Sequence, residues 1–280
     1  MNYQILLKKA SKELKSISVS NPILDSEILL SNALKISREK MLLNLNKKIT
    51  QSEIDKFNKL LIKRKKKEPI AYIFGSKEFW KTTFVINQSV LIPRPETELL
   101  VEQSLKYLKK NRDYKVLDIG TGSGCILISI LKERTKCKGI GIDFSKEAIK
   151  VAKINAKMQQ LENRIKFVYS DVDKFLSSKY DLIVSNPPYI KTCELKNLNE
   201  DIKNYEPIMA LDGGSDGLSE IKKIIIRSSE LLKRGGRLVL EIGHGQLNSV
   251  VNMIKEKKYY INNISKDLAG NTRCITSIKI

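Results

Sequence analysis

The sequence predicts an α/β protein in which a parallel β-sheet, covered by helices on both faces, follows a small helical bundle. Three observations support this prediction. A chain of 280 residues with 41% hydrophobic side chains is long enough for one large or two unequal globular domains. Its first 67 residues place apolar side chains at helical spacing. From residue 115, strands alternate with helices, which is typical of parallel sheets.

Helix signals organise the N-terminal part of the chain. Asn21 followed by Pro22 is an N-cap with a first-turn proline, and Thr50-Gln51-Ser52-Glu53 is a capping box ahead of an apolar helical pattern. Pro69 ends the last of these helices. We therefore expect a helical domain over residues 1–67. It has no glycine-rich loops or paired acids for chemistry, so we expect it to hold a partner.

A linker with a pair of strands is expected over residues 68–94, where Gly75 precedes alternating side chains such as Thr83 to Ile86. The second domain is then residues 95–280, which begins with a helix whose leucines lie on one side.

The elements of this second domain follow in a regular order. Strands are expected at Lys115–Ile119, Gly139–Asp143, Ile165–Tyr169, Tyr180–Ser185 and Arg237–Ile242. Helices are expected from Cys125, from the N-cap Ser145 to about Gln160, and over Leu218–Lys233 before Gly235 and Gly236. Two further strands around Gly270 complete the chain from Tyr259.

The net charge of +20 suggests a nucleic-acid partner at first sight. Lysine supplies most of the 51 basic residues, however, and this bias is typical of an A+T-rich genome. The dense run Lys63–Lys67 ends a helical pattern, where cations suit the negative end of the helix dipole. We therefore expect no specific nucleic-acid partner.

Composition also excludes several other classes of protein. No apolar run approaches the roughly 18 residues of a membrane span, and charges interrupt the N-terminal segment where a signal peptide is apolar. The four cysteines form no CxxC pair, and His244 is the only histidine. Zinc binding and Ser-His-Asp or Cys-His catalysis therefore lack residues, unless His244 serves as the base. We expect metal-free chemistry in the cytoplasm, away from membranes.

A glycine-rich turn, Gly120-Thr121-Gly122-Ser123-Gly124, follows the first strand, and Asp143 ends the second. Glycines allow a ligand to approach the backbone closely, and a carboxylate at the end of the second strand can accept both ribose hydroxyls of a nucleoside. The spacing is GxGxG rather than the GxGxxG of dinucleotide sites, and Asp118 lies two residues before it. A pyrophosphate disfavours a nearby anion, whereas a sulfonium with an amino-acid tail tolerates one. The turn therefore favours S-adenosylmethionine over NAD; an ordinary tight βα turn is the alternative.

Asp171 follows the third strand, where its carboxylate could meet an adenine amino group. The alternative is that Asp171 is a simple cap for a short helix that begins at Val172.

Asn186-Pro187-Pro188-Tyr189, after the fourth strand, is the strongest functional signal in the sequence. Two prolines stiffen the backbone and remove two N–H donors, which leaves the Pro187 carbonyl free to face a ligand beside the Asn186 side-chain oxygen. Two such acceptors can hold both hydrogens of an –NH2 group, and Tyr189 offers a flat surface to a planar amide or base. A rigid turn that caps a strand is the alternative, and the glycine turn and Asp143 argue against it.

Together these motifs resemble the class I S-adenosylmethionine-dependent methyltransferases that modify planar nitrogens. Val90-Leu91-Ile92-Pro93-Arg94-Pro95-Glu96-Thr97-Glu98 resembles the signature of the release factor glutamine methyltransferases, the PrmC/HemK family. Supporting matches occur at Gly75–Trp80, Glu206-Pro207 and Glu241-Ile242-Gly243. The resemblance covers nearly the whole chain, through layout alone over residues 1–67. It implies a Rossmann-like sheet that is mostly parallel, with an antiparallel last strand.

The resemblance also implies three sets of site residues. S-adenosylmethionine, which becomes S-adenosylhomocysteine, would contact Gly120, Thr121, Gly122, Ser123, Gly124, Asp143, Asp171, Val172 and Asn186. Asn186, Pro187 and Tyr189 would be catalytic, and Pro188 and Phe79 would join them in binding the substrate. The Asn186 oxygen and the Pro187 carbonyl would aim a glutamine –NH2 at the methyl group, without a metal. Val172 stands where some relatives carry an aromatic residue.

The implied substrate is the glutamine of the Gly-Gly-Gln loop of bacterial class 1 peptide chain release factors. The helical domain would bind the release factor, and the enzyme is expected to be a monomer. Three alternatives remain open. A ribosomal-protein glutamine methyltransferase shares the Asn186–Tyr189 motif but differs over Arg94–Glu98. An adenine-N6 methyltransferase fits the charge, although residues 1–67 lack an obvious helix-turn-helix or zinc module. A non-catalytic binding protein is disfavoured by the intact motif.

Overall fold

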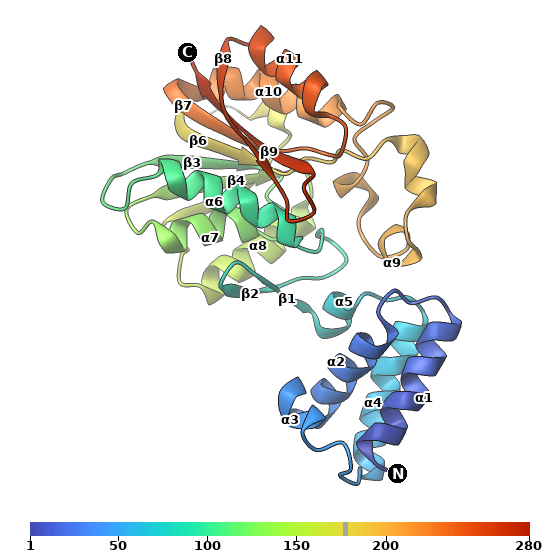
Figure 1. Ribbon diagram of the computed structural model, residues 1–280. Helices are drawn as coiled ribbons and strands as arrows, with labels where there is room; N and C mark the ends of the chain where they lie inside the picture. The colour runs from blue at the N-terminus through green and yellow to red at the C-terminus, as the bar shows by residue number, and fades with distance from the viewer. Residues whose placement is uncertain (176–178) are drawn as a thin grey trace. The chain divides into compact units, whose positions relative to one another are not determined.

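The computed structural model describes residues 1–175 and 179–280, which form two compact units (Figure 1). The helical unit consists of Met1–Gly75 together with Asn199–Tyr205, and the sheet unit consists of Ser76–Leu198 and Glu206–Ile280. The helical unit therefore extends beyond residue 67 and includes a segment from far along the chain.

The helical unit contains the expected helices and three short additions. Its helices are α1 (Tyr3–Ser16), α2 (Pro22–Leu34), α3 (Arg38–Leu42), α4 (Gln51–Lys65), α5 (Ile70–Phe74) and, from the distant segment, α9 (Glu200–Lys203). The predicted capping box of α4 is present: the Thr50 hydroxyl accepts from the Glu53 N–H, and the Glu53 carboxylate accepts from the Thr50 N–H. Leu14, Leu30 and Phe57 lie at the centre of its own apolar core.

An ion-pair cluster joins Asn199–Tyr205 to the rest of the helical unit. The Arg64 guanidinium donates to Asp25 and to Asp201, each with an N···O distance of 2.7 Å. The Arg64 side chain is only 5% exposed, so both pairs are largely shielded from water. The Tyr205 hydroxyl donates to the Lys66 carbonyl at 2.7 Å, which secures the end of the segment.

The sheet unit is built on seven strands. They are β3 (Lys115–Ile119), β4 (Lys138–Asp143), β5 (Ile165–Tyr169), β6 (Tyr180–Ser185), β7 (Leu232–Glu241), β8 (Tyr259–Lys266) and β9 (Thr272–Lys279). Their order is β5-β4-β3-β6-β7-β9-β8, and among these strands β9 runs antiparallel to both of its neighbours. The predicted Rossmann-like sheet, mostly parallel with an antiparallel last strand, is confirmed.

The largest difference from the predicted boundaries lies between α10 and β7, because the strand expected at Arg237–Ile242 runs over Leu232–Glu241. The helix expected to end at Lys233 ends at Leu231, and β7 begins at Leu232. Tyr180 of β6 pairs with Leu232, and the register then shifts before Leu182 pairs with Arg237. The glycine pair at 235 and 236 therefore lies in a bulge of the strand, which accommodates the positive φ of Gly235, and does not end the helix.

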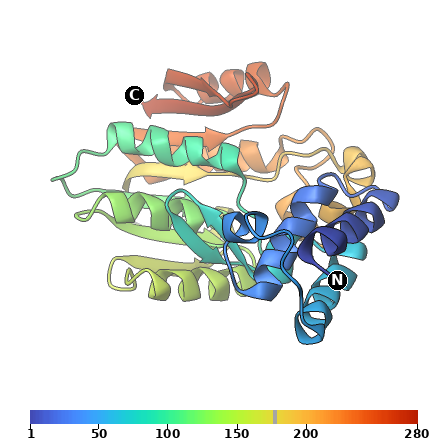
Figure 2. The same cartoon turned by 60° about the horizontal axis from the view of Figure 1, so that its bottom comes forward.

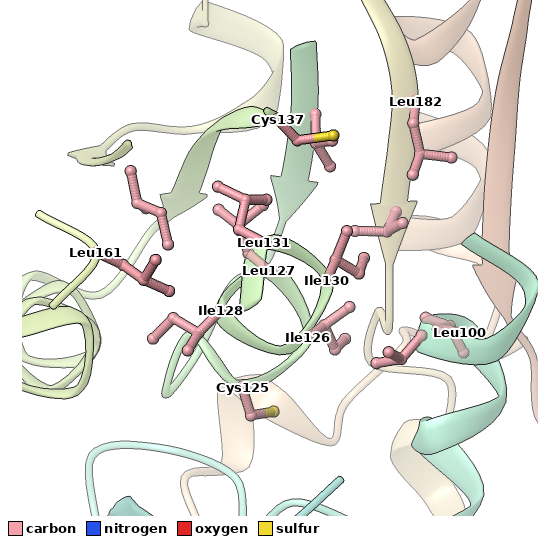
Figure 3. Close-up of a cluster of buried hydrophobic side chains, with 14 of the residues drawn as sticks. Leu100, Cys125, Ile126, Leu127, Ile128, Ile130, Leu131, Cys137, Leu161 and Leu182 are labelled. Carbon is pink, nitrogen blue, oxygen red and sulfur yellow. The ribbon is translucent and has the colours of Figure 1, made fainter. Parts of the chain in front are cut away.

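Helices cover both faces of the sheet (Figures 1 and 2). One face packs on α6 (Glu98–Tyr107), α7 (Cys125–Glu133) and α8 (Lys146–Met158), and the other packs on α10 (Ser219–Leu231) and α11 (Leu247–Glu256). Along β6, Leu182 and Val184 belong to the first layer and Ile183 to the second, as strand alternation requires. Figure 3 shows α7 enclosed by side chains of the first layer. From Cys125 to Leu131 the sequence of α7 is apolar except for Ser129, and every one of these residues is buried, which fits a helix enclosed by the core over this stretch.

Short elements complete the sheet unit. The hairpin β1 (Ser76–Phe79) and β2 (Thr82–Val85) confirms the predicted strand pair, and η1 (Pro95–Thr97), η2 (Val172–Lys174), η3 (Thr192–Asn197) and η4 (Ile208–Ala210) are 3₁₀ helices. The Asn155 side chain accepts from the Val85 N–H at 2.7 Å and donates to the Val85 carbonyl, which fixes the hairpin to α8. Across the part of the chain that the structure describes, no helix has both the length and the apolar character needed to cross a bilayer.

Candidate active site

The strand order places the candidate site at the carboxyl edge of the sheet. From β3 the chain moves outward through β4 to β5, and it then returns to β6 on the other side of β3. The loops after β3 and β6 therefore diverge, and ligands of open α/β sheets bind in the crevice between such loops. A cavity of about 580 Å³ lies there, lined by the glycine turn after β3, the ends of β4 and β5, and Asn186, Pro187 and Pro188 after β6.

The glycine turn leaves room for a ligand at two of its three glycines. Gly120 and Gly122 have φ values of +72° and +54°, and a methyl group added to either would meet no atom within 4 Å. Thr121 and Ser123 line the cavity beside them. Gly124 lies outside the cavity wall: a methyl group there would meet Ile128 at 3.0 Å, so this glycine serves the packing of α7.

Asp143 is held rigidly beside the glycine turn. Its Oδ2 accepts from the Gly122 N–H at 2.8 Å, and its Oδ1 accepts from the Ser145 N–H at 2.9 Å. Burial raises the pKa of this carboxyl, while these backbone hydrogen bonds oppose the shift. Each oxygen keeps a second lone pair, so the carboxylate can accept further hydrogen bonds from the cavity side.

Asp118 lies behind the turn and does not line the cavity. It is fully buried, and its Oδ2 accepts from the Thr121 hydroxyl at 2.7 Å. Its Oδ1 has no hydrogen-bond partner among residues 1–175 and 179–280. Burial raises the pKa of Asp118 to about 7, so the negative charge considered in the sequence analysis is costly at this position.

Asp171 and Val172 meet the cavity where β5 ends. Asp171 caps η2 by accepting from the Asp173 N–H at 3.0 Å, and it also lines the cavity, so the two interpretations of this residue are compatible. Val172 lines the cavity from the buried side. Sequence reasoning missed Phe144, which is 58% exposed and also lines the cavity. Its position directly after Asp143, at the end of β4, could have indicated that Phe144 lies at the cavity.

The Asn186 side chain is oriented by a neighbour from a distant segment. Its Nδ2 donates to the Thr97 hydroxyl at 3.0 Å, and Thr97 is only 3% exposed. Because the amide nitrogen is engaged there, the Oδ1 atom remains as the acceptor that Asn186 can offer to the cavity.

Tyr189 lies behind the motif instead of in the cavity wall, contrary to the flat surface that the sequence suggested. Burial raises the pKa of its phenol to about 12, and the nearby Glu241 adds to this shift. Its carbonyl accepts from the Gln246 Nε2 at 3.0 Å, and the Gln246 Oε1 accepts from the Gly243 N–H. Gln246 therefore ties the motif to the end of β7.

Phe79 was wrongly predicted to bind the substrate. It is 2% exposed within the apolar layer around α7, and its ring packs edge-on against Phe84 with centroids 6.2 Å apart. The alternation that identified the hairpin strand gave no information on which face of that strand is buried.

Arg94 and Glu206 form a second cluster at the cavity that spacing alone could not reveal, because they are 112 residues apart. The Arg94 guanidinium donates to Glu206 Oε1 at 2.5 Å, and the Ile92 N–H donates to Glu206 Oε2 at 3.1 Å. Next to Glu206, Ile208 and Met209 line the cavity and are more than half exposed. Within the described ranges, no group of three or more His, Cys, Asp or Glu side chains could hold a metal ion.

Fold and cavity together define a methyltransferase domain. Residues 110–277 match the family described as "Methyltransferase domain". A solved methyltransferase from Pyrococcus furiosus superposes with a TM-score of 0.52 at 17% identity, covering 70% of this chain and 88% of its own. A ribosomal protein L11 methylase from Lactobacillus delbrueckii subsp. bulgaricus gives 0.51 at 18% identity, with 67% and 81% covered.

The family can be stated more narrowly. Residues 6–75 match the PrmC N-terminal domain. The release factor glutamine methyltransferase of Clostridium acetobutylicum is 38% identical over 100% of this chain and 99% of its own, and that of Buchnera aphidicola is 40% identical over 95% of each. The chain belongs to the release factor glutamine methyltransferase family. It spans 57% of another relative, the bifunctional methyltransferase of Rickettsia typhi, at 38% identity.

Proposed function

We propose that this protein methylates the side-chain nitrogen of a glutamine in a peptide chain release factor, with S-adenosylmethionine as the methyl donor. The supporting observation is the orientation of Asn186, whose Nδ2 is engaged by Thr97 so that Oδ1 remains for a substrate –NH2 group. The names of the relatives supply the substrate class. The glutamine is that of the Gly-Gly-Gln loop of bacterial class 1 factors, as the family resemblance implies.

The cavity fits an S-adenosylmethionine molecule. Gly120 and Gly122 leave open space where any side chain would project, and Asp143 presents two fixed acceptors to a ribose. Asp171 and Val172 would meet the adenine. When bound, the donor supplies an electrophilic methyl group on a sulfonium.

The residues of the motif would make a poor nucleophile reactive. A carboxamide nitrogen reacts poorly because its lone pair is delocalised into the carbonyl. Asn186 Oδ1 and the Pro187 carbonyl would accept hydrogen bonds from the –NH2 group, orient the lone pair toward the methyl carbon, and stabilise the positive charge that develops on nitrogen. The nitrogen would lose one proton during or after the transfer, and S-adenosylhomocysteine would be the other product. Ile208 and Met209, exposed at the cavity, would cover the bound loop and exclude water.

The remaining features are assigned accordingly. The helical unit would dock the body of the release factor, and the sheet unit would receive its glutamine. Because release factors act in translation, the proposal places the enzyme in the cytoplasm. The monomeric state stays a prediction.

Radiolabelled methyl transfer tests the proposal against its alternatives. Purified release factor, ribosomal proteins and duplex DNA are offered separately, and we expect labelled glutamine in the release factor alone. Labelling of DNA or of a ribosomal protein in its place would overturn the assigned substrate.

Asn186 variants test the role of the motif. We expect Asn186→Ala to lower the single-turnover rate by about 10²–10³ while cofactor affinity changes little, because one preorganised contact to the reacting group is lost. Asn186→Asp, which keeps an acceptor and adds a charge, should retain part of the activity. A wild-type rate in Asn186→Ala would contradict the positional mechanism.

A further inference from the structure

A buried carboxyl group lies next to the residue that orients Asn186. Glu241 ends β7 and is 1% exposed. Hydrogen bonds from the Thr97 and Tyr189 hydroxyls stabilise its charged form. Its Oε2 has no hydrogen-bond partner within the described parts of the chain, so this group is incompletely satisfied. Thr97 therefore has Glu241 on one side and Asn186 on the other.

The single hydroxyl proton of Thr97 makes these two contacts interdependent. An ionised carboxylate can only accept, so the Thr97 proton must point to Glu241. The Thr97 oxygen can then only accept, which is what the Asn186 Nδ2 contact at 3.0 Å requires. A protonated Glu241 could instead donate to Thr97 and release the Thr97 proton toward Asn186. The amide would then be stable in the flipped orientation, with its –NH2 toward the cavity.

We propose that Glu241 is a positioning residue whose ionised carboxylate, acting through the Thr97 hydroxyl, holds the Asn186 amide with its oxygen toward the substrate. The inference rests on the proposed function, because the substrate group in question is the glutamine –NH2. A flipped Asn186 would set one –NH2 group against another, and the substrate would lose one of its two acceptors. Glu241 itself touches neither substrate nor cofactor.

The electrostatic surroundings place the ionisation of Glu241 within the working range of an enzyme. Burial raises its pKa to about 7, and Glu96 from η1 adds to the shift. The hydroxyls of Thr97 and Tyr189 lower the pKa, as does the guanidinium of Arg273 on β9. Cys274 pairs with Glu241 across β7 and β9, and burial keeps its thiol neutral by raising its pKa. The oriented form of Asn186 therefore accumulates as the pH rises through about 7.

Single-turnover kinetics with saturating cofactor and release factor, measured between pH 5.5 and 8.5, test whether methyl transfer depends on the ionisation of Glu241. The wild-type rate should fall about tenfold per pH unit on the acid side of a midpoint near 7. Glu241→Gln should react roughly tenfold more slowly than wild type at pH 8, because a glutamine amide can also turn its –NH2 toward Thr97 and then no longer accepts the Thr97 proton. The variant should also lose the acid limb, because glutamine does not ionise. A wild-type midpoint in folded Glu241→Gln would overturn the proposal.

Thr97 variants keep the test informative if Glu241→Gln does not fold. Thr97→Ser retains the hydroxyl and should retain both rate and acid limb, whereas Thr97→Val should lose both. Thr276→Val is the matched control, because Thr276 is also 3% exposed but its hydroxyl neighbours the Cys274 thiol and not the Asn186 amide. Equal rates in Thr97→Val and Thr276→Val would refute a relay through Thr97.

A spectroscopic readout separates this proposal from the proposed function. In cofactor-free protein labelled with ¹⁵N-asparagine, the Asn186 amide resonances are assigned by their absence from Asn186→Ala. We expect them to shift with the kinetic midpoint in wild type and to stay constant in Glu241→Gln. Constant resonances in wild type would overturn the role of Glu241 even if release factor is methylated. A pH-dependent shift without methylation of release factor would support that role and reject the substrate.

Asp118 is a second buried carboxyl group, and burial raises its pKa to about 7 as well. It backs the glycine turn through Thr121, so its ionisation should change cofactor affinity, which saturation removes from the rate. It is also intact in Glu241→Gln, where an acid limb due to Asp118 would persist.

Discussion

Replacing Asp143 with asparagine removes a negative charge that binds the backbone of the glycine turn and that, as we propose, also accepts hydrogen bonds from the ribose. In the structure, the carboxylate accepts from the Gly122 N–H at 2.8 Å and from the Ser145 N–H at 2.9 Å. Asparagine has one acceptor oxygen, so its –NH2 must face one of these donors or turn toward the ribose. In either orientation, the side chain at position 143 loses one charge-assisted hydrogen bond, to the backbone or to the ribose, and cofactor binding is weakened.

A hydrogen bond to a charged group contributes about 1.5–3 kcal/mol. Its loss corresponds to roughly 10–150-fold weaker cofactor binding, since about 1.4 kcal/mol is tenfold. Asp143→Ala loses both acceptors and should lie at or beyond the upper end of this range. Because burial raises the pKa of Asp143, wild-type affinity should also decline on acidification earlier than at an exposed aspartate.

Titration calorimetry with S-adenosylhomocysteine measures the effect directly, and thermal unfolding shows whether each variant is folded. Asp113→Asn is the matched control, because Asp113 is exposed on the loop before β3 and lies outside this cavity. We expect its affinity to equal that of wild type. Unchanged affinity in a folded Asp143→Asn protein would remove Asp143 from the binding site and refute the reasoning.

Three further outcomes are expected. Removal of Met1–Gly75 should leave S-adenosylhomocysteine affinity nearly unchanged but abolish methylation of intact release factor; full methylation by the truncated protein would exclude a docking role. Arg64→Met should destabilise the helical unit by about 3 kcal/mol, because Asp25 and Asp201 lose their buried partner, and should expose Asn199–Tyr205 to protease; unchanged protection would contradict this. Asp118→Asn should gain stability relative to wild type as the pH rises from about 4 to about 7. The native pKa of about 7 exceeds the ordinary 3.8, so wild type loses stability over this window and changes little above it. Denaturant titrations with equal pH dependence for the two proteins would disprove this.

The elements that the sequence predicted well are those with local causes. β3, β5 and β6 begin and end at the expected residues because each is a short, mostly apolar segment that a glycine or a polar residue follows. The cap of α4 follows from side chains that meet their own backbone three residues away. Motif positions after β3, β4 and β6 follow from topology, since parallel strands bring their carboxyl ends to one edge.

Predictions failed where the deciding contact is distant in sequence. Phe79 belongs to the core because α7 and Phe84 cover it, and nothing near Phe79 encodes that contact. The glycines at 235 and 236 resemble a helix stop, yet pairing with β6 draws them into a strand. Asn199–Tyr205 joins the helical unit through Arg64, whose partners are recognisable only once the chain has folded.

The Asn186–Tyr189 motif illustrates the same limit at the level of chemistry. The motif specifies an amide and a proline carbonyl, but an asparagine amide can present either a donor or an acceptor. Thr97, from a segment before the sheet, takes up the nitrogen and so selects the oxygen for the cavity. Thr97 can do so only while its own proton is engaged elsewhere, and the buried Glu241 is placed to take it. In the relay that we propose, the charge on Glu241, at the end of another strand, decides the orientation of the Asn186 amide, and the motif itself does not encode this charge.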